Sequence, residues 1–343
     1  MNLKLFFVLF LPVALQDTVN NSKLEQYRKD FMKQLLNGIS FQLPTLSLSG
    51  KKKDSKTSKK TQALADEPVK FYLYTRQYPF NSLVINNNVS LINPKLPVKM
   101  LVHGWTEHYY VEWCKKLTAA YLKKGLYNVI VLDWSSRGDA DYISASLAVP
   151  EISTSVGNFI ANRIHRGRKV PLERIHLISH SLGAHVAGLS GQRVIKVLGK
   201  PLGRITALDP AAPYFDLFTL QNDDRLSPDD AAFVDIVHTD GGWLGFRQSL
   251  GTTDFYPNGG TAVQPGCSLL KADVQYEDLF CSHARSHKFF VRSVLKKDMK
   301  AVPCDSWSKF DQGACKGNEV NFGDDAPNNI TGNYFLRTPE DIS

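Results

Sequence analysis

Long hydrophobic runs, metal-binding cysteine motifs and internal repeats are all missing from this 343-residue sequence. After residue 15 no stretch is apolar enough to supply the roughly 20 residues that a membrane-spanning helix needs. The cysteines and histidines show no C-x-x-C pair and no cluster with the spacing of a structural zinc site. These absences argue against a transmembrane protein, a zinc-stabilised module and a repeat array, and we expect no metal and no cofactor.

One apolar run does occur, from Leu5 to Leu15, and it follows a positively charged start that contains Lys4. It is too short to span a bilayer and has the form of a secretory signal peptide, which we place at residues 1–16. We therefore expect a secreted, extracellular protein. Three sequons fit N-glycosylation in that compartment and begin at Asn20, Asn88 and Asn329.

The cysteine count is odd, since the sequence has five. In an oxidising compartment this predicts two disulfides and one remaining thiol. Pairing nearest neighbours joins Cys267 to Cys281 and Cys304 to Cys315, which leaves Cys114 free.

Positive charge is concentrated before the folded part of the chain, although the net charge of the whole sequence is +8. Residues 51–60 form a Lys/Ser-rich tract with almost no apolar side chains, which predicts disorder. We interpret residues 17–66 as a solvated or processed segment rather than a nucleic-acid-binding one. A weak attraction of this tract to anionic lipid surfaces stays open.

Short apolar segments and helical patterns alternate from Val69 onward, and 43% hydrophobic residues are ample for a core. Strands are expected at 71–75, 82–85, 98–103, 128–133, 175–178, 204–209 and 233–238, and helices at 110–122, 152–164 and 182–197. This alternation predicts one α/β domain over residues 67–343, with a mostly parallel sheet covered by helices on both faces.

A serine lies at the sharpest predicted turn, in Ser179-His-Ser181-Leu-Gly183, between the strand at 175–178 and the helix that follows. A strand, a tight turn and a helix are the context in which G-x-S-x-G forms a nucleophile elbow. Here Ser179 stands where the motif has its first glycine. Ser181 is therefore the candidate nucleophile.

A serine nucleophile needs a base, and the base needs a carboxylate that orients it. Asp209 ends a predicted strand before Pro210, and the order serine, aspartate, histidine is that of hydrolases with such an elbow. The spacing alone leaves His238 and His283 open as the base. His287 is expected to face solvent or the core, while His180 and His185 are expected to be core or turn histidines.

The oxyanion of the tetrahedral intermediate needs two backbone N–H donors. One is expected from Leu182, the residue after the serine. The loop His103-Gly104-Trp105, which follows an earlier strand, is well placed to supply the other.

Six motifs occur in a fixed order and carry a family resemblance: His103-Gly-Trp, Ser179-His-Ser-Leu-Gly-Ala-His185, Gly203-Arg-Ile-Thr-Ala-Leu-Asp209-Pro, Phe233-Val-Asp-Ile-Val-His-Thr-Asp240, Asp254-Phe-Tyr-Pro-Asn-Gly-Gly260 and Cys281-Ser-His-Ala-Arg-Ser286. The chain resembles the pancreatic lipase family, especially its shorter arthropod-type members that include phospholipases A1. The resemblance runs from about Val69 to a closing strand at 332–338. It implies an α/β-hydrolase fold, here without the C-terminal β-sandwich of the larger members.

The resemblance also implies roles for single residues. Ser181, Asp209 and His283 fall at the catalytic triad, which selects His283 over His238. Trp105 and Leu182 fall at the oxyanion donors. Cys267 and Cys281 match the cysteines that close the family's lid, whose apolar face would here be Leu269, Leu270, Val274 and Leu279.

Two loops and one departure bear on the substrate. The lid between Cys267 and Cys281 and the loop between Asp240 and Asp254 each have thirteen residues, and both are short for the family. In the family, truncation of both loops goes with phospholipase A1 activity. Asn222 and Ser227 stand where calcium-binding members have carboxylates, so no calcium is expected.

The expected function is a secreted carboxylic-ester hydrolase that cleaves acyl esters of lipids through an acyl-enzyme, as a phospholipase A1 or a neutral lipase. Its partner would be lipid at a membrane or emulsion interface. No nucleic acid is expected, and no protein partner is assigned. The alternative is a catalytically silent lipid-binding or storage relative such as the yolk proteins, which would not require an intact Ser181, Asp209 and His283.

Overall fold

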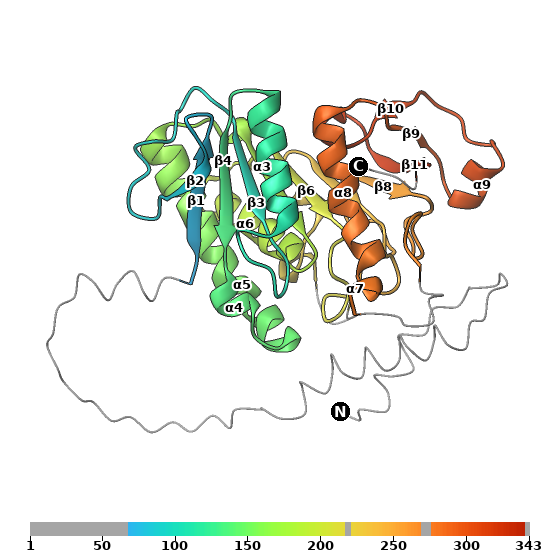
Figure 1. Cartoon of the computed structure of the whole chain (residues 1–343), viewed down its shortest axis with the longest axis horizontal. Helices are drawn as coiled ribbons and strands as arrows, with labels where there is room; N and C mark the ends of the chain where they lie inside the picture. Colours follow the sequence, from blue (N-terminus) through green and yellow to red (C-terminus); the bar gives the residue numbers. More distant parts are fainter. Residues whose placement is uncertain (1–67, 217–220, 269–275, 340–343) are drawn as a thin grey trace, which may run out of the picture.

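The computed structural model describes residues 68–216, 221–268 and 276–339 (Figure 1). The expected signal peptide, the Lys/Ser-rich segment, the sequon at Asn20 and the lid residues Leu269, Leu270 and Val274 lie outside the described residues. No helix of the described part is both long and apolar enough to cross a membrane.

Eleven strands of the described chain form a single sheet in the order β10-β9-β11-β8-β7-β6-β5-β3-β4-β1-β2. The strands are β1 (Lys70–Thr75), β2 (Tyr78–Val84), β3 (Val98–Val102), β4 (Asn128–Asp133), β5 (Ile175–His180), β6 (Arg204–Leu208), β7 (Val234–Val237), β8 (Thr253–Pro257), β9 (Lys300–Pro303), β10 (Val320–Asn321) and β11 (Gly332–Leu336). Neighbours from β4 through β3, β5, β6, β7 and β8 to β11 are parallel. The outer pairs that contain β1, β2, β9 or β10 are antiparallel.

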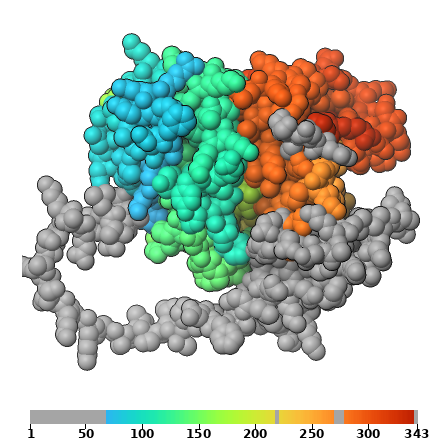
Figure 2. All heavy atoms as spheres, in the orientation of Figure 1, coloured from blue at the N-terminus to red at the C-terminus, as the bar shows by residue number. Residues whose placement is uncertain are grey.

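The α-helices are α3 (Glu112–Lys124), α4 (Ser135–Gly138), α5 (Tyr142–Asn158), α6 (Gly183–Leu198), α7 (Tyr276–Leu279), α8 (Cys281–Leu295) and α9 (Trp307–Asp311). A π-helix, η2 (Phe159–Gly167), continues α5, and the 3-10 turns are η3 (Leu172–Arg174), η4 (Asn222–Asp224), η5 (Pro228–Asp230) and η6 (Gly323–Asp325). Figure 1 shows α3 and α8 side by side on one face of the sheet, and α5 packs against α6 on the other. In the space-filling view of Figure 2, α3 and α8 cover the face turned to the reader.

Alternate residues of the central strands enter different hydrophobic layers because successive side chains of a strand point to opposite faces. Met100 and Val102 belong to the cluster that contains the core residues of α5 and α6. Leu101, between them, belongs to the cluster of α3 and α8. A mostly parallel sheet with helices on both faces confirms the predicted α/β-hydrolase architecture.

The second expected helix differs from the observed one. The pattern predicted a helix over 152–164, whereas α5 begins at Tyr142, and the π-helix η2 extends the helical stretch to Gly167. Asp141 caps the start of α5 by accepting a hydrogen bond from the Ser144 N–H at 3.0 Å. Pro150 lies inside α5 and lacks the N–H that would donate to the preceding turn, yet the helix runs through it.

A buried ionic cluster lies at the amino ends of the central strands. Asp324 of η6 accepts hydrogen bonds from Lys99 of β3, Tyr121 of α3 and Lys124 of α3, at 3.0, 2.6 and 2.7 Å. Next to it Arg204 of β6 donates to both oxygens of Asp235, each at 2.8 Å, and to the carbonyl oxygens of Gly323 and Asp324. The cluster therefore joins the segment at η6 to α3 and three central strands.

The charges of this cluster depend on one another. Burial lowers the pKa of the Lys99 ammonium, and the carboxylate of Asp324 opposes that effect. Burial alone would raise the pKa of Asp324, but the cations facing it hold that pKa well below its usual range. Removing one partner would leave a buried, uncompensated charge on the other.

We predict that Asp324→Asn lowers the free energy of unfolding by about 3–5 kcal/mol, because Lys99 loses its anion. The matched control is Asp298→Asn, which breaks the pair between Arg292 and a carboxylate that is 41% exposed and should cost less than about 1 kcal/mol. Urea unfolding monitored by circular dichroism measures both. Because the pKa of Asp324 is depressed in the fold, its contribution is present above about pH 4 and falls as the pH drops below that value. Equal losses in the two variants would contradict the prediction.

Candidate active site

The elbow predicted at Ser181 is present between β5 and α6. Ser181 has φ of 54°, in the left-handed region that non-glycine residues seldom occupy. Its N–H donates to the Leu208 carbonyl at 3.1 Å, and its own carbonyl accepts from the N–H groups of Ala184 and Ala211 at 3.0 and 3.3 Å. These bonds fix the strained turn at the carboxyl end of β5.

Close packing requires small residues around this turn. A Cβ on Gly183 would lie 2.3 Å from the His103 carbonyl oxygen, so only glycine lets α6 start against the loop after β3. Ser179, which replaces glycine in the motif, is fully buried, and its hydroxyl donates to the Thr206 carbonyl of β6 at 3.2 Å. The elbow therefore accommodates serine at this position by giving its hydroxyl an acceptor.

Asp209 and His283 meet beside the elbow, although they are far apart in the sequence. The Nδ1 atom of His283 lies 2.5 Å from Oδ2 of Asp209. The other carboxylate oxygen, Oδ1, accepts the N–H groups of Thr239 and Asp240 at 2.8 and 3.0 Å. Asp209 is fully buried and His283 is 4% exposed, so bulk water does not compete for this bond.

Burial lowers the pKa of the His283 imidazole from its ordinary value, and the hydrogen bond to Asp209 opposes part of that effect. The neutral imidazole is therefore favoured. With its Nδ1–H donated to Asp209, the second ring nitrogen of a neutral His283 is a proton acceptor. This is the protonation state that a general base requires.

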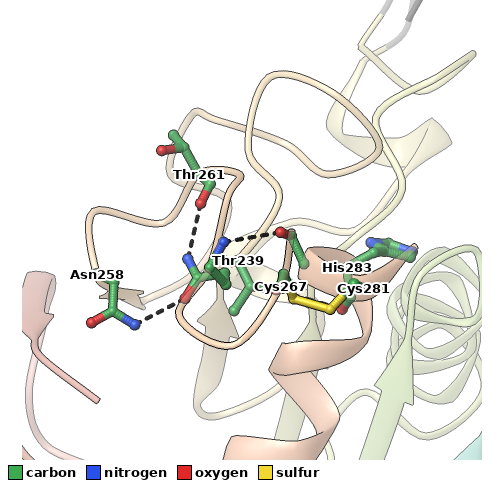
Figure 3. Close-up of a disulfide and its surroundings, with 8 residues drawn as sticks. Thr239, Asn258, Thr261, Cys267, Cys281 and His283 are labelled. Carbon is green, nitrogen blue, oxygen red and sulfur yellow. Dashed lines mark hydrogen bonds between the residues drawn. A yellow bond between two sulfur atoms is a disulfide. The ribbon is translucent and has the colours of Figure 1, made fainter. Parts of the chain in front are cut away.

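The predicted disulfide between Cys267 and Cys281 is confirmed and anchors the first turn of α8, which carries His283 (Figure 3). Next to it the Ser282 hydroxyl accepts the Gln264 N–H at 3.0 Å, while the Gln264 side chain bonds the turn at Asn258. The second predicted disulfide, between Cys304 and Cys315, is also confirmed, and Cys114 is a buried free thiol.

The two predicted oxyanion donors lie on either side of the elbow. Leu182 precedes the first residue of α6, and Trp105 follows Gly104, whose Cα position is so close that an added Cβ would lie 3.1 Å from Cβ of Ser181. Within the described part of the chain, neither the Trp105 nor the Leu182 backbone N–H has a hydrogen-bond acceptor. Both groups are therefore available to a ligand oxygen.

The other histidines near the elbow have structural partners. His238, the alternative base in the sequence, is held between Asp254 Oδ1 and the Phe246 carbonyl oxygen, each at 2.8 Å. His185 is buried and contacts the Ala211 carbonyl oxygen at 2.8 Å, as expected for a core residue. The rings of His238 and His185 therefore bond to groups other than Asp209.

His180 lies closer to the site than the sequence indicated. It is buried, but its ring centroid is only 4.6 Å from that of His283. Its Nδ1 faces Glu107 Oε2 at 3.5 Å, and Glu107 also accepts the Gly104 N–H at 2.6 Å. Sequence reasoning missed Glu107, because an acidic residue in a loop carries no periodic signal. Its place two residues after Trp105 was the one available hint.

The two short loops beside the site pack against each other. Trp243 and Leu244, from the loop between Asp240 and Asp254, are buried in a small apolar cluster. Leu279, at the end of the lid segment, packs against that cluster together with Phe280 and Ala262. Leu279, which the sequence assigned to an apolar lid face, is therefore partly buried against the neighbouring loop.

Two groups of residues bear on metal binding. Asp209, Asp240 and His283 have ligand atoms within 4.8 Å of one another, as the described residues show. A cation there would compete with the Asp209–His283 hydrogen bond, so we assign these atoms to the dyad. In the segment compared with calcium sites, the N–H and hydroxyl of Ser227 bond the two oxygens of Asp230, each at 2.8 Å. Burial raises the pKa of Asp230 to about 6, and both of its oxygens already accept the Ser227 donors.

The candidate glycosylation residues Asn88 and Asn329 are both exposed, as a modification site requires. Asn88 Oδ1 accepts the Ser90 N–H at 3.0 Å. Attachment of a glycan at either residue stays a prediction.

Comparison with known proteins places the chain in a family. The sequence model of the family described as Lipase matches residues 34–336. Human lipoprotein lipase is 39% identical over 235 residues, which are 63% of this chain and 48% of that protein. Guinea pig (Cavia porcellus) pancreatic triacylglycerol lipase is 32% identical over 269 residues, which are 72% of this chain and 56% of that protein. The chain thus spans about half the length of the curated relatives it matches.

Similarity to solved structures is weaker. An esterase from Pyrococcus furiosus aligns with 45% of this chain and 66% of its own, at a TM-score of 0.31 and 16% identity. The family match and the two lipase relatives, together with the parallel sheet and the elbow at Ser181, establish the family. The chain belongs to the pancreatic lipase family of the α/β-hydrolase superfamily.

Proposed function

We propose that this protein is a carboxylic-ester hydrolase that cleaves acyl esters of lipids. Ser181 is the nucleophile, His283 is the general base, and Asp209 is the carboxylate that orients His283. One observation carries the proposal. The buried 2.5 Å contact between Asp209 and His283 lies at the carboxyl ends of the central strands, beside Ser181 with its φ of 54°. A strained serine beside a carboxylate–histidine pair is the arrangement that activates a hydroxyl.

The proposed reaction follows from these positions. The second ring nitrogen of His283 takes the Ser181 hydroxyl proton as the serine oxygen bonds to the ester carbonyl carbon. The N–H groups of Trp105 and Leu182 stabilise the negative oxygen of the tetrahedral intermediate. His283 then gives its proton to the leaving alcohol, which departs and leaves an acyl-enzyme. Water, activated by the same histidine, releases the fatty acid.

The substrate class is proposed from the loops that border the site. The disulfide across the lid closes a sequence separation of only 14 residues, and the end of the lid packs on the equally short neighbouring loop. Short loops leave more room for a bulky polar headgroup, which favours a phospholipase A1. A neutral-glyceride lipase is the second version, supported by the relative named a pancreatic triacylglycerol lipase. In both versions the substrate is lipid at a membrane or emulsion interface.

Secretion is part of the proposal. The apolar run at residues 5–15 has the form of a signal peptide, and two disulfides fit an oxidising compartment. A silent lipid-binding protein of the yolk type is the alternative function. The oriented Asp209–His283 pair beside Ser181 argues against it, because lipid binding alone does not require that pair.

We predict that Ser181→Ala lowers ester turnover at least about 10³-fold, because no nucleophile remains to form the acyl-enzyme. The matched control is Ser179→Gly, which changes a serine two residues away and restores the glycine of the motif. Hydrolysis of a soluble short-chain ester, with circular dichroism as a check of folding, measures both variants. Undiminished turnover in a folded Ser181→Ala protein would contradict the mechanism.

We predict that kcat/KM of the native enzyme rises with pH through an apparent pKa below 6.5. Only neutral His283 accepts the serine proton, and burial lowers its pKa from the ordinary value of 6.5. A pH–rate profile with a soluble ester measures this acid limb. An acid limb above about pH 7 would be inconsistent with the buried dyad as the base.

We predict that phospholipid labelled at the first acyl position loses its label faster than phospholipid labelled at the second. The open site should also hydrolyse phospholipid vesicles faster than a triglyceride emulsion. Release of labelled fatty acid from the three substrates, with Ser181→Ala as the blank, measures this selectivity. Preference for triglyceride would favour the neutral-lipase version, and preference for the second position would rule out the phospholipase A1 version.

A further inference from the structure

A second carboxylate–histidine pair, Glu107 with His180, lies beside the Asp209–His283 pair. Glu107 belongs to the loop after β3, and its side chain is 20% exposed, whereas that of His180 is 7% exposed. The ring of His180 contacts the rings of both His283 and His287, with centroid distances of 4.6 and 5.0 Å. The catalytic reaction proposed above assigns no role to Glu107.

The carboxylate of Glu107 connects three elements around the elbow. Its Oε2 accepts the Gly104 N–H at 2.6 Å, a short bond to a charged acceptor. Both of its oxygens lie 3.2 Å from Nε1 of Trp113, which anchors the carboxylate to α3. The third contact is Nδ1 of His180, the residue before Ser181, at 3.5 Å.

Gly104 is held from both sides as a result. Glu107 accepts its N–H, and its carbonyl oxygen lies 2.9 Å from Nδ1 of His103. The N–H and C=O of a trans peptide point in opposite directions, so fixing the Gly104 carbonyl toward His103 turns the Trp105 N–H away from His103. That N–H has no acceptor in the described part of the chain. The His103 contact therefore sets the peptide plane of the Trp105 N–H, and the Glu107 contact fixes the peptide plane just before it.

We propose that Glu107 is a positioning residue of the hydrolytic site, which holds the Gly104–Trp105 loop so that the Trp105 N–H is aligned with the oxyanion. This inference rests on the proposed function. Glu107 touches no reacting atom and acts through Gly104. The length of the Glu107 side chain, which brings its carboxylate to the Gly104 N–H, matters more for this role than its charge.

The environment keeps Glu107 in the form that accepts hydrogen bonds. Burial alone would raise the pKa of Glu107, but the facing His180 ring and the Gly104 N–H hold that pKa well below its usual range. An ionised carboxylate has only acceptor sites, so it cannot turn a donor toward Gly104. Within the described residues, Nε2 of His180 and Nδ1 of His287 have no hydrogen-bond partner, whereas Nδ1 of His180 faces Glu107.

Two conservative variants separate the effect of the length of the Glu107 side chain from the effect of its charge. Glu107→Gln keeps the length of the side chain and an acceptor oxygen but loses the charge. Glu107→Asp keeps the charge but withdraws the acceptor from Gly104 by one methylene. Glu112→Gln, at a residue of α3 whose side chain is 71% exposed, is the control for loss of a nearby negative charge.

The measurement is kcat and KM for a soluble p-nitrophenyl ester, normalised to active sites titrated with a phosphonate, together with the inhibition constant of a trifluoromethyl ketone. We expect Glu107→Asp to lower kcat about 10²-fold, in the range seen when one oxyanion donor is lost, with KM changed little. The affinity for the ketone, which forms a tetrahedral adduct with an oxyanion, should fall in parallel. Glu107→Gln should retain most of the kcat, and Glu112→Gln all of it.

Other outcomes overturn the proposal. If Glu107→Asp keeps full kcat per titrated site and only lowers the melting temperature, Glu107 has a structural role alone. If Glu107→Gln is the more impaired variant, charge rather than side-chain length is what the site needs. Turnover that survives in Ser181→Ala would instead refute the proposed function, so the two failures are distinguishable.

Discussion

The left-handed backbone of Ser181 is the constraint on which the rest of this site depends. A non-glycine residue at φ of 54° persists only where its surroundings over-determine it. Strand order supplies those surroundings, because β5 lies between β3 and β6. The neighbour β6 gives the Leu208 carbonyl that accepts the Ser181 N–H, and the loop after β3 packs Gly104 against the serine. The same two neighbours carry Asp209 and Trp105, so the contacts that stabilise the strained turn also assemble the site.

The sheet separates two sets of buried charges, one at each end. At the amino ends of β3 and β6, Lys99 and Arg204 are neutralised by Asp324 and Asp235. At the carboxyl ends, Asp209 is satisfied by a histidine and two backbone N–H groups. The first arrangement pairs full charges and joins η6 to the sheet. The second leaves a neutral histidine that gains a proton during the proposed reaction, which requires an environment that stabilises both forms.

Histidines in this protein differ in role through their partners rather than through their type. His238 is held by Asp254 and a carbonyl oxygen, so its ring links the end of β7 to β8. Among the described residues Nδ1 of His283 contacts Asp209, which leaves the second ring nitrogen for chemistry. His180, expected to be a core or turn histidine, is buried, and its ring also lies against that of His283, with Glu107 and Trp113 among its other neighbours. The sequence offered no rule that separates these cases by spacing.

The α/β class, the elbow at Ser181 and the two disulfide pairings could all be predicted from the sequence, because each of them follows from local patterns and neighbouring residues. The sequence also indicated Asp209 and His283, although the choice between His283 and His238 needed a family resemblance. The extent of α5 became clear only in the folded structure, where Asp141 caps a helix that begins at Tyr142 and continues through Pro150. The tertiary structure alone brought Glu107 onto Gly104 and His180, and Leu279 onto Trp243. Such contacts join loops through single hydrogen bonds and small apolar clusters. They could not be predicted, because they produce no periodic pattern in the sequence.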